Sequence, residues 1–304
     1  METGICNVKT ASLSYKLYGK LADPLIVVET ALGASTAEWW HLAEKWSGEY
    51  CVLLYDRAGY GSSSGSILPR SPANIATELN QLLTVLGIQK QAILIGHSMG
   101  GLYAQQFASM FSDKAHAIIL LDPVSPQNYI LKQKLSKQEY YQCGFDKSAN
   151  MRLGLLISSL GLGFLLKSLL RKAPPFYYYN HFSAEAEIAI LKNSTQKKTY
   201  QSSLAEYGFI DSANVSQAQA TKAEFPEIPL VLICHTPEIM SAEMVQYGGA
   251  DQETATKCDG IWISLMKEYL GFSSKSKFIQ AKNSGHYIHL SDPDTLREAI
   301  TSLT

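Results

Sequence analysis

The stretch Gly-His-Ser-Met-Gly-Gly at residues 96–101 decides how this chain is interpreted. It follows the apolar run 92–95 and precedes a helix-forming segment, so a strand, a sharp turn and a helix are expected in that order. A serine on such a turn is typical of a nucleophile elbow, which displays the hydroxyl at the end of the strand. The backbone of such a turn is tightly packed, so the residues two positions before and after the serine must be small. Gly96 and Gly100 meet this requirement on the two sides of Ser98.

The helix that follows Ser98 adds an electrostatic argument. Its first backbone N–H groups and the positive end of its dipole point to the place where a negatively charged oxygen would form. The Gly-x-Ser-x-Gly pattern also occurs in ordinary turns between a strand and a helix. The strand before it and the helix after it are the context that the catalytic motif requires, and they favour a nucleophilic role for Ser98.

Strand-like and helix-like segments alternate along most of the chain. This alternation predicts right-handed crossovers and a doubly wound, mostly parallel sheet, which is an α/β fold. Between about residues 125 and 225 the alternation stops, and the sequence is helical or irregular. The expected strands lie near 11–17, 25–28, 51–55, 92–95, 117–121, 229–234 and 277–280, and the expected helices near 37–46, 72–86, 102–107, 255–270 and 293–303.

Composition sets limits on partners and location. The chain has 304 residues, 46% of them hydrophobic, and a formal net charge of −1, which gives no sign of a nucleic-acid partner. The first residues lack a basic region followed by an apolar run, so we expect no secretory signal and a cytoplasmic protein. The cysteines show no paired spacing for a metal and are expected to be reduced and mostly buried: Cys6, Cys51, Cys143, Cys234 and Cys258.

The chain resembles the α/β-hydrolase superfamily, specifically its capped esterase-like branch. The resemblance covers nearly the whole chain outside the segment 125–225, and it rests on motifs at 32–35, 56–63, 96–101 and 284–286. It implies an eight-stranded sheet with an inserted helical lid that shapes the substrate pocket. The expected division is a core of residues 1–124 and 226–304 with a helical cap at 125–225.

A serine hydroxyl needs a neighbouring base and a group that orients the base. In this fold the chain order is serine, acid, histidine, so the base is expected in a late loop. His286 follows the last expected strand, and Gly285 gives its loop freedom to turn the imidazole toward Ser98. The resemblance places the base at this position as well. His289 lies closer to the final helix and is the weaker candidate.

Two residues are candidates for the acid. By the resemblance, the acid follows the strand that resumes the sheet after the cap, where this chain has Glu238 in place of the usual aspartate. Glutamate is an accepted third member of such a triad. The alternative is Asp122, at the end of the strand before the cap, which could instead cap a loop before Pro123. We favour Glu238 and keep Asp122 as the alternative.

Acyl transfer also needs two backbone N–H donors that face the developing oxyanion. Met99, directly after Ser98, is expected to supply one of them. Leu32 occupies the matching place in the loop after the strand at 25–28 and is expected to supply the other through its backbone. Relatives often read His-Gly there, so the side chain differs from the family pattern.

The cap contains an apolar stretch from Leu153 to Leu166. It could pack inside the cap, line an apolar acyl pocket, or contact a membrane surface. The last interpretation rests on charge, since residues 125–172 carry eight Lys or Arg against Glu139 and Asp146, an excess of six positive charges. Apolar surface beside positive charge suits anionic lipid.

Together these residues predict a serine hydrolase that acts on a small-molecule carboxylic ester with an apolar acyl part. Ser98 attacks the carbonyl carbon, His286 transfers the proton, the acid orients the imidazole, and the backbone of Leu32 and Met99 holds the oxyanion. This chemistry requires neither a metal nor an organic cofactor. The alternative is a non-catalytic small-molecule receptor or scaffold on the same fold.

Overall fold

The computed structural model describes residues 1–210 and 224–304. Within these residues, one eight-stranded sheet has the strand order β1-β2-β4-β3-β5-β6-β7-β8. The two pairs formed by β2 are antiparallel and all the other pairs are parallel, as the alternation of strands and helices predicts. The strands are β1 (Glu2–Asn7), β2 (Ser12–Tyr18), β3 (Leu25–Glu29), β4 (Cys51–Tyr55), β5 (Ala92–His97), β6 (Ala115–Leu121), β7 (Leu230–Cys234) and β8 (Ser276–Gln280).

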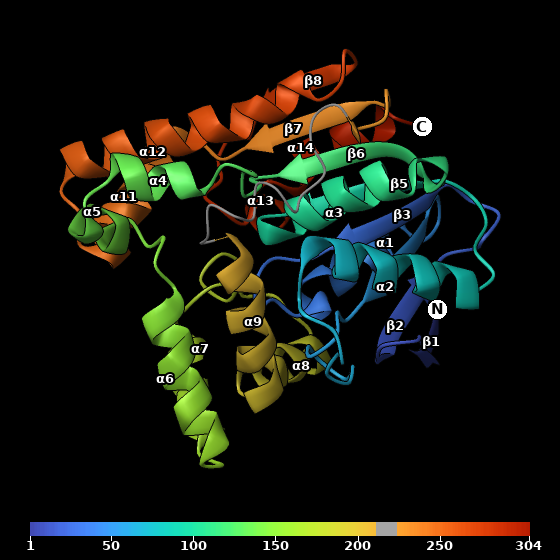
Figure 1. Ribbon diagram of the computed structural model, residues 1–304, viewed down its shortest axis with the longest axis horizontal. Coiled ribbons are helices and arrows are strands. Elements are labelled where there is room, and N and C mark those ends of the chain that lie inside the picture. Colours follow the sequence, from blue (N-terminus) through green and yellow to red (C-terminus); the bar gives the residue numbers. More distant parts are fainter. Residues whose placement is uncertain (211–223) are drawn as a thin grey trace.

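Helices cover both faces of the sheet, which is why the central strands β3, β4 and β5 are buried along their whole length. In β3, Leu25 and Val27 belong to the core cluster that includes residues of α2, α3 and α12, whereas Ile26 and Val28 belong to the cluster on the other face, which includes residues of α1 and α14. Figure 1 shows helices on both sides of the sheet. The helical segments of this core are η1 (Thr36–Trp39), α1 (Trp40–Trp46), α2 (Pro72–Val85), α3 (Met99–Met110), η2 (Ser112–Lys114), α11 (Pro237–Glu243), η5 (Met244–Gly248), α12 (Gln252–Lys267), η6 (Glu268–Gly271), α13 (Ile288–Ser291) and α14 (Pro293–Thr301).

The described residues between β6 and β7 are mainly helical, and we call residues 129–210 the cap. Figure 1 shows α6 and α7 extending away from the sheet, with α9 beside α6. Part of the cap expected at 125–225, namely residues 211–223, lies outside the described residues. The cap helices are α4 (Tyr129–Lys134), α5 (Lys137–Gln142), α6 (Ser148–Ser159), η3 (Gly163–Leu166), α7 (Lys167–Leu170), α8 (Ala184–Ser194) and α9 (Lys197–Ile210).

Two elements differ from the sequence prediction. The edge strand β1 was not predicted, because its residues are mostly exposed and only Cys6 is buried, so no apolar alternation marks it. A helix, α11, begins at Pro237 in a segment expected to be a loop, with the proline in its first turn. Among the described residues, no helix is both long enough and apolar enough to cross a membrane. All five cysteines are buried and none forms a disulfide.

Candidate active site

Ser98 stands on the sharp turn between β5 and α3. Its backbone has φ 55° and ψ −120°, a conformation that residues other than glycine rarely adopt. The Ser98 N–H donates to the carbonyl of Leu121 at 3.0 Å, and the Ser98 carbonyl accepts from the N–H of Val124 at 3.0 Å. These two bonds fix the serine turn to the end of β6, as a nucleophile elbow requires.

The glycines of the turn are needed for close approach. A Cβ at Gly96 would lie 2.6 Å from the carbonyl oxygen of Gly100, and a Cβ at Gly100 would collide with the carbonyl oxygen of Glu29. The second contact shows that the start of α3 packs directly against the end of β3. The loop after β3, where one oxyanion donor is predicted, therefore lies beside the serine turn.

His286 is paired with Asp122. The Nδ1 atom of His286 lies 2.6 Å from Oδ2 of Asp122, and the carboxylate is fully buried whereas the imidazole side chain is 21% exposed. Asp122 directly follows β6 and has φ +46°, and its N–H donates to the carbonyl of Ile233 at 2.8 Å. The carbonyl of His286 accepts a hydrogen bond of 2.9 Å from Nε2 of His97, the residue before Ser98.

The preference for Glu238 over Asp122 as the partner of His286 is wrong on this geometry. Glu238 lies in the first turn of α11 and its side chain is exposed. His235 directly follows β7, and the carboxylate that contacts His286 comes from the end of the neighbouring strand β6. Within the described residues, the side-chain hydrogen bonds of His286 go to Asp122 alone. Contact of His286 with the Ser98 hydroxyl therefore stays a prediction.

His235 lies between two carboxylates behind this pair. Its Nδ1 is 2.6 Å from Oδ1 of Asp122, and its Nε2 is 2.6 Å from Oδ1 of Asp259 on α12. Burial by itself lowers the pKa of His235, but the two carboxylates outweigh this and raise the pKa to about 10. His235 is thus an imidazolium at neutral pH that donates both of its N–H groups.

The same contacts keep Asp122 ionised. Burial alone would raise the pKa of this carboxyl, but His235 first, and then His286, hold it well below its usual range. With two carboxylates and one imidazolium, the group formed by Asp122, His235 and Asp259 carries one net negative charge. Because ionised Asp122 accepts, His286 donates from Nδ1, and Nε2 is the ring nitrogen left for another partner.

Asp259→Asn is expected to destabilise the protein in a pH-dependent way. The raised pKa of His235 means that its contribution is complete below its ordinary pKa near 6.5 and is lost as the pH rises toward about 10. We expect a loss of about 1.5–3 kcal/mol in the free energy of unfolding near neutral pH. Urea unfolding of the variant and the wild type at about pH 7 and about pH 10 measures this loss of stability. An equal loss at both pH values would contradict the charged state assigned to His235.

The buried side chain of Arg57 supports the loop that follows β3. Its guanidinium donates to the carbonyls of Thr30 at 2.8 Å and Ala31 at 3.0 Å, and it forms a buried ion pair with Glu29 at 3.4 Å. Burial raises the pKa of Glu29 to about 7, an effect that Arg57 and a hydrogen bond from Tyr55 only partly offset. Glu29 is therefore part of the support of this loop.

Leu32 and Met99 belong to one apolar cluster, so the two predicted oxyanion donors lie on neighbouring segments. The cap contributes Tyr207 and Ile210 to the same cluster, with Met151 packed against it. The backbone roles of Leu32 and Met99 stay a prediction. The side chains show that apolar surface from both core and cap gathers beside the serine turn.

Glu206 on α9 joins the cap to the core. It is completely buried and accepts hydrogen bonds from Tyr60 at 2.9 Å and Tyr103 at 3.0 Å. It also forms ion pairs with Arg57 at 3.2 Å and Arg70 at 3.6 Å. Arg57 thus connects the loop after β3 to the cap helix.

Glu206→Gln is expected to lower the free energy of unfolding by about 3–5 kcal/mol, because it leaves buried guanidinium groups without a full counter-charge. Glu187→Gln is the matched control. Glu187 pairs with Arg171 at 2.6 Å on the surface of the cap, so its loss should cost at most about 1 kcal/mol. Urea unfolding of both variants measures the difference. Equal effects would show that Glu206 does not hold the cap in place.

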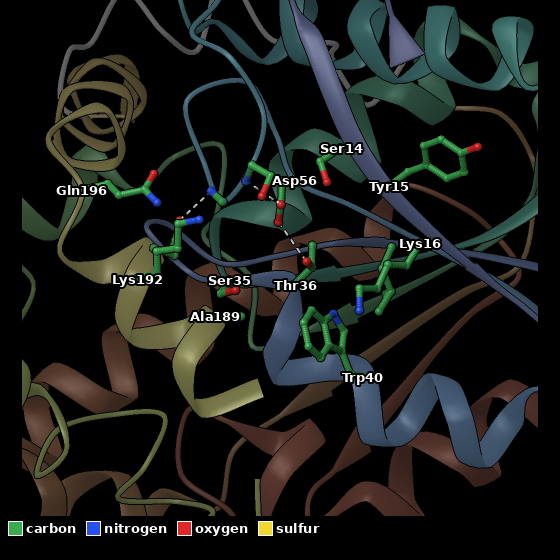
Figure 2. A pocket seen from close by; sticks show the side chains of 14 residues that line it. Ser14, Tyr15, Lys16, Ser35, Thr36, Trp40, Asp56, Ala189, Lys192 and Gln196 are labelled. Carbon is green, nitrogen blue, oxygen red and sulfur yellow. Dashed lines mark hydrogen bonds between the residues drawn. The ribbon is translucent and has the colours of Figure 1, made fainter. Parts of the chain in front are cut away.

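Figure 2 shows a cavity of about 160 Å³ at a second contact between cap and core. Among the residues that line the cavity, Thr36 donates to Asp56 at 2.8 Å, and Nζ of Lys16 lies 3.4 Å from the centroid of the Trp40 ring. Its lining includes Ala189, Lys192 and Gln196 of the cap but none of the residues of the serine turn or of the Asp122 pair. We therefore do not assign the substrate to this cavity.

Residues missed by the sequence interpretation surround His286. Tyr178 of the cap donates to Glu243 and stacks on Tyr287, with ring centroids 4.8 Å apart. Glu243 lies against Gly285, where a Cβ would collide with its carboxyl group. The aromatic run at 176–179 was the only signal for this contact. Among the described residues, no group of three His, Cys, Asp or Glu side chains is arranged to hold a metal.

A sheet that displays a serine on a strand–helix turn, with a histidine–aspartate pair beside it, is the arrangement found in α/β hydrolases. The chain belongs to the alpha/beta hydrolase family, whose model matches residues 31–299.

Similar proteins cover different shares of the chain. An AB hydrolase superfamily protein of Gibberella zeae is 23% identical in a match 295 residues long that covers 90% of this chain and 84% of that protein. The 3-oxoadipate enol-lactonase 2 of Acinetobacter baylyi is 30% identical over 109 residues, 36% of this chain and 40% of that protein. The crystal structure of the enol-lactonase from Burkholderia xenovorans has a TM-score of 0.64 and 16% identity, covering 99% of both chains. A hydrolase from Pseudomonas aeruginosa has a TM-score of 0.63 and 18% identity, covering 99% of this chain and 97% of that one.

Proposed function

We propose that this chain is a serine hydrolase that cleaves carboxylic esters with an apolar acyl part. The observation that carries the proposal is the hydrogen bond of 2.6 Å between Nδ1 of His286 and buried, ionised Asp122, beside the strained turn of Ser98. This pairing leaves Nε2 of His286 as the free basic atom near the serine. Catalytic hydrogen bonds are often longer in a structure without substrate and tighten when it binds.

In this mechanism, Nε2 of His286 takes the proton from the Ser98 hydroxyl as the oxygen attacks the ester carbonyl carbon. The N–H groups of Met99 and Leu32 hold the developing oxyanion. The tetrahedral intermediate collapses, the ester C–O bond breaks, and His286 returns the proton to the leaving alcohol. Water, deprotonated by His286, then attacks the acyl carbon; the bond to the Ser98 oxygen breaks, His286 returns the proton to that oxygen, and the acid is released. Asp122 keeps the imidazole in the productive tautomer and stabilises its protonated form.

The apolar acyl part is inferred from the cluster formed by Leu32, Met99 and the cap residues Tyr207 and Ile210. The stretch 153–166 does not support an acyl pocket, because most of its large side chains are exposed. The Acinetobacter baylyi relative is named an enol-lactonase. An enol-lactone is a cyclic ester, and its carbonyl carbon is open to the same attack. That likeness supports ester chemistry for this chain.

A fluorophosphonate probe separates this function from a non-catalytic receptor on the same fold. We expect the folded chain to react with the probe at Ser98, because an activated serine attacks phosphorus as it does a carbonyl. Peptide mass spectrometry should locate the adduct at Ser98, and Ser98→Ala should remove it. Folded protein that is not modified at Ser98 would favour the receptor.

A further inference from the structure

The outer part of the cap exposes an unusual amount of apolar surface. Along α6, η3 and α7, all within the described residues, seven large apolar side chains have exposed fractions between 40% and 68%. Contiguous apolar surface of this kind marks an interaction site far more often than isolated exposed residues do. We call these side chains the apolar tip: Leu153, Leu156, Leu160, Leu162, Phe164, Leu165 and Leu169.

The exposure follows from how α6 packs. Gly154 is buried against the ring of Tyr200 on α9, so closely that a Cβ there would collide with the ring. Leu153, Leu156 and Leu160 follow one another at spacings of three and four residues, so they form one stripe along the helix, and all three are exposed. One face of α6 is thus used inside the cap, and the stripe is left in contact with solvent.

The apolar surface continues around a turn. Gly161 has φ +75° and lets the chain reverse after α6, and η3 and α7 then present Phe164, Leu165 and Leu169. In Figure 1 this part of the cap extends away from the sheet. A partner helix would cover a single stripe, whereas here apolar side chains continue from α6 around the turn to α7.

The charged residues near the apolar tip indicate which kind of partner it binds. Residues 147–172 contain no Asp or Glu and five basic residues: Lys147, Arg152, Lys167, Arg171 and Lys172. Arg152, Lys167 and Lys172 are exposed and lie beside or between residues of the apolar tip in the sequence, whereas Arg171 is paired with Glu187 of α8. An apolar surface flanked by cations matches the boundary between acyl chains and anionic headgroups, where each basic residue adds attraction.

We propose that the apolar tip binds the surface of an anionic lipid bilayer. The 12 residues of α6 extend for about 18 Å, so the helix lies in the headgroup region with its leucine stripe toward the acyl chains. The basic residues then contact the headgroups. This inference does not depend on Ser98 or on ester cleavage.

The chain runs directly from the apolar tip to residues of the candidate active site. The segment after α7 carries Tyr178, which contacts Glu243 and Tyr287 beside His286. The segment that follows the apolar tip in the sequence is thus part of the cap that contacts the candidate site.

Flotation of the full chain with vesicles tests the proposal. One set of vesicles contains phosphatidylcholine alone, and the other also contains phosphatidylglycerol. We expect the protein to float with the anionic vesicles, to bind the neutral ones at least tenfold more weakly, and to lose anionic binding as salt screens the charges. No flotation with the anionic vesicles, or equal binding to both kinds, would overturn the proposal.

Paired variants locate the contact. Leu156→Glu combined with Leu165→Glu should reduce flotation by at least tenfold, because it places two charges in the apolar tip. The control is Val85→Glu combined with Ile188→Glu, which changes two equally exposed apolar residues elsewhere and should leave flotation unchanged. Circular dichroism and thermal unfolding show whether each variant folds. If the double glutamate variant fails to fold, Leu156→Ser combined with Leu165→Ser replaces it.

A second pair tests the charges. Lys167→Glu combined with Lys172→Glu should weaken binding to anionic vesicles by about tenfold or more, whereas Lys192→Glu on α8 should change it little. Size-exclusion chromatography of the same proteins tests the competing occupant. If the chain forms a dimer that the Leu156 and Leu165 variant abolishes, and does not float, the apolar tip joins two copies and the lipid proposal is wrong.

Discussion

We expect Asp122→Asn to lower kcat for ester hydrolysis by about 10³–10⁴-fold while the protein stays folded. Ionised Asp122 holds Nδ1–H of His286 at 2.6 Å and so leaves Nε2 basic. An asparagine side chain can present its NH₂ group to Nδ1, which would favour the wrong imidazole tautomer. Steady-state hydrolysis of p-nitrophenyl esters measures the loss.

Glu238→Gln is the control for this prediction. Glu238 is exposed in the first turn of α11, so we expect its substitution to leave kcat and KM nearly unchanged. If Glu238→Gln removes turnover and Asp122→Asn retains it, the acid assigned from the structure is wrong.

Ser98→Ala is expected to have the largest effect, a loss of kcat of about 10⁵–10⁶-fold. Alanine keeps the Cβ of serine on the strained turn, so the fold should survive and only the attacking oxygen is removed. The matched control is Ser109→Ala, on the helix α3 that follows Ser98, whose buried hydroxyl has no hydrogen-bond partner among the described residues. Equal turnover in Ser98→Ala and the wild type would show that another group performs the cleavage.

The sequence was sufficient to predict the central strands and the serine turn. Continuous apolar runs such as 25–28 and 92–95 mark strands buried on both faces, and glycines at fixed positions mark the turn. These signals are local, since each can be seen within a few residues. The position of His286 was also accessible, because it depends only on the end of β8 and the glycine before it.

The acid could not be predicted because its choice depends on contacts between distant segments. Counting residues after β7 placed Glu238 near the site, but Pro237 starts a helix there and the glutamate side chain is exposed. Asp122 reaches His286 across 164 positions of sequence. No local pattern distinguishes a carboxylate with this contact from one that caps a loop.

Asp259 did leave a signal that the interpretation missed. It lies on the buried face of α12, where Ala255, Cys258 and Trp262 are also buried. A charged residue on the apolar face of a helix needs a buried partner, and here that partner is His235. For 153–166 the sequence left three interpretations open, because hydrophobicity alone does not tell buried from exposed side chains and exposure depends on whether α9 covers them.

The most direct test of the central claim is to trap the acyl group on Ser98. The protein is mixed with p-nitrophenyl butyrate, quenched in acid during turnover, and digested for peptide mass spectrometry. We predict a butyryl group on the Ser98 peptide of the wild type and a strongly reduced amount in Asp122→Asn. Ester turnover with no acyl group on Ser98 at any quench time, or with the acyl group on a different residue, would contradict the account.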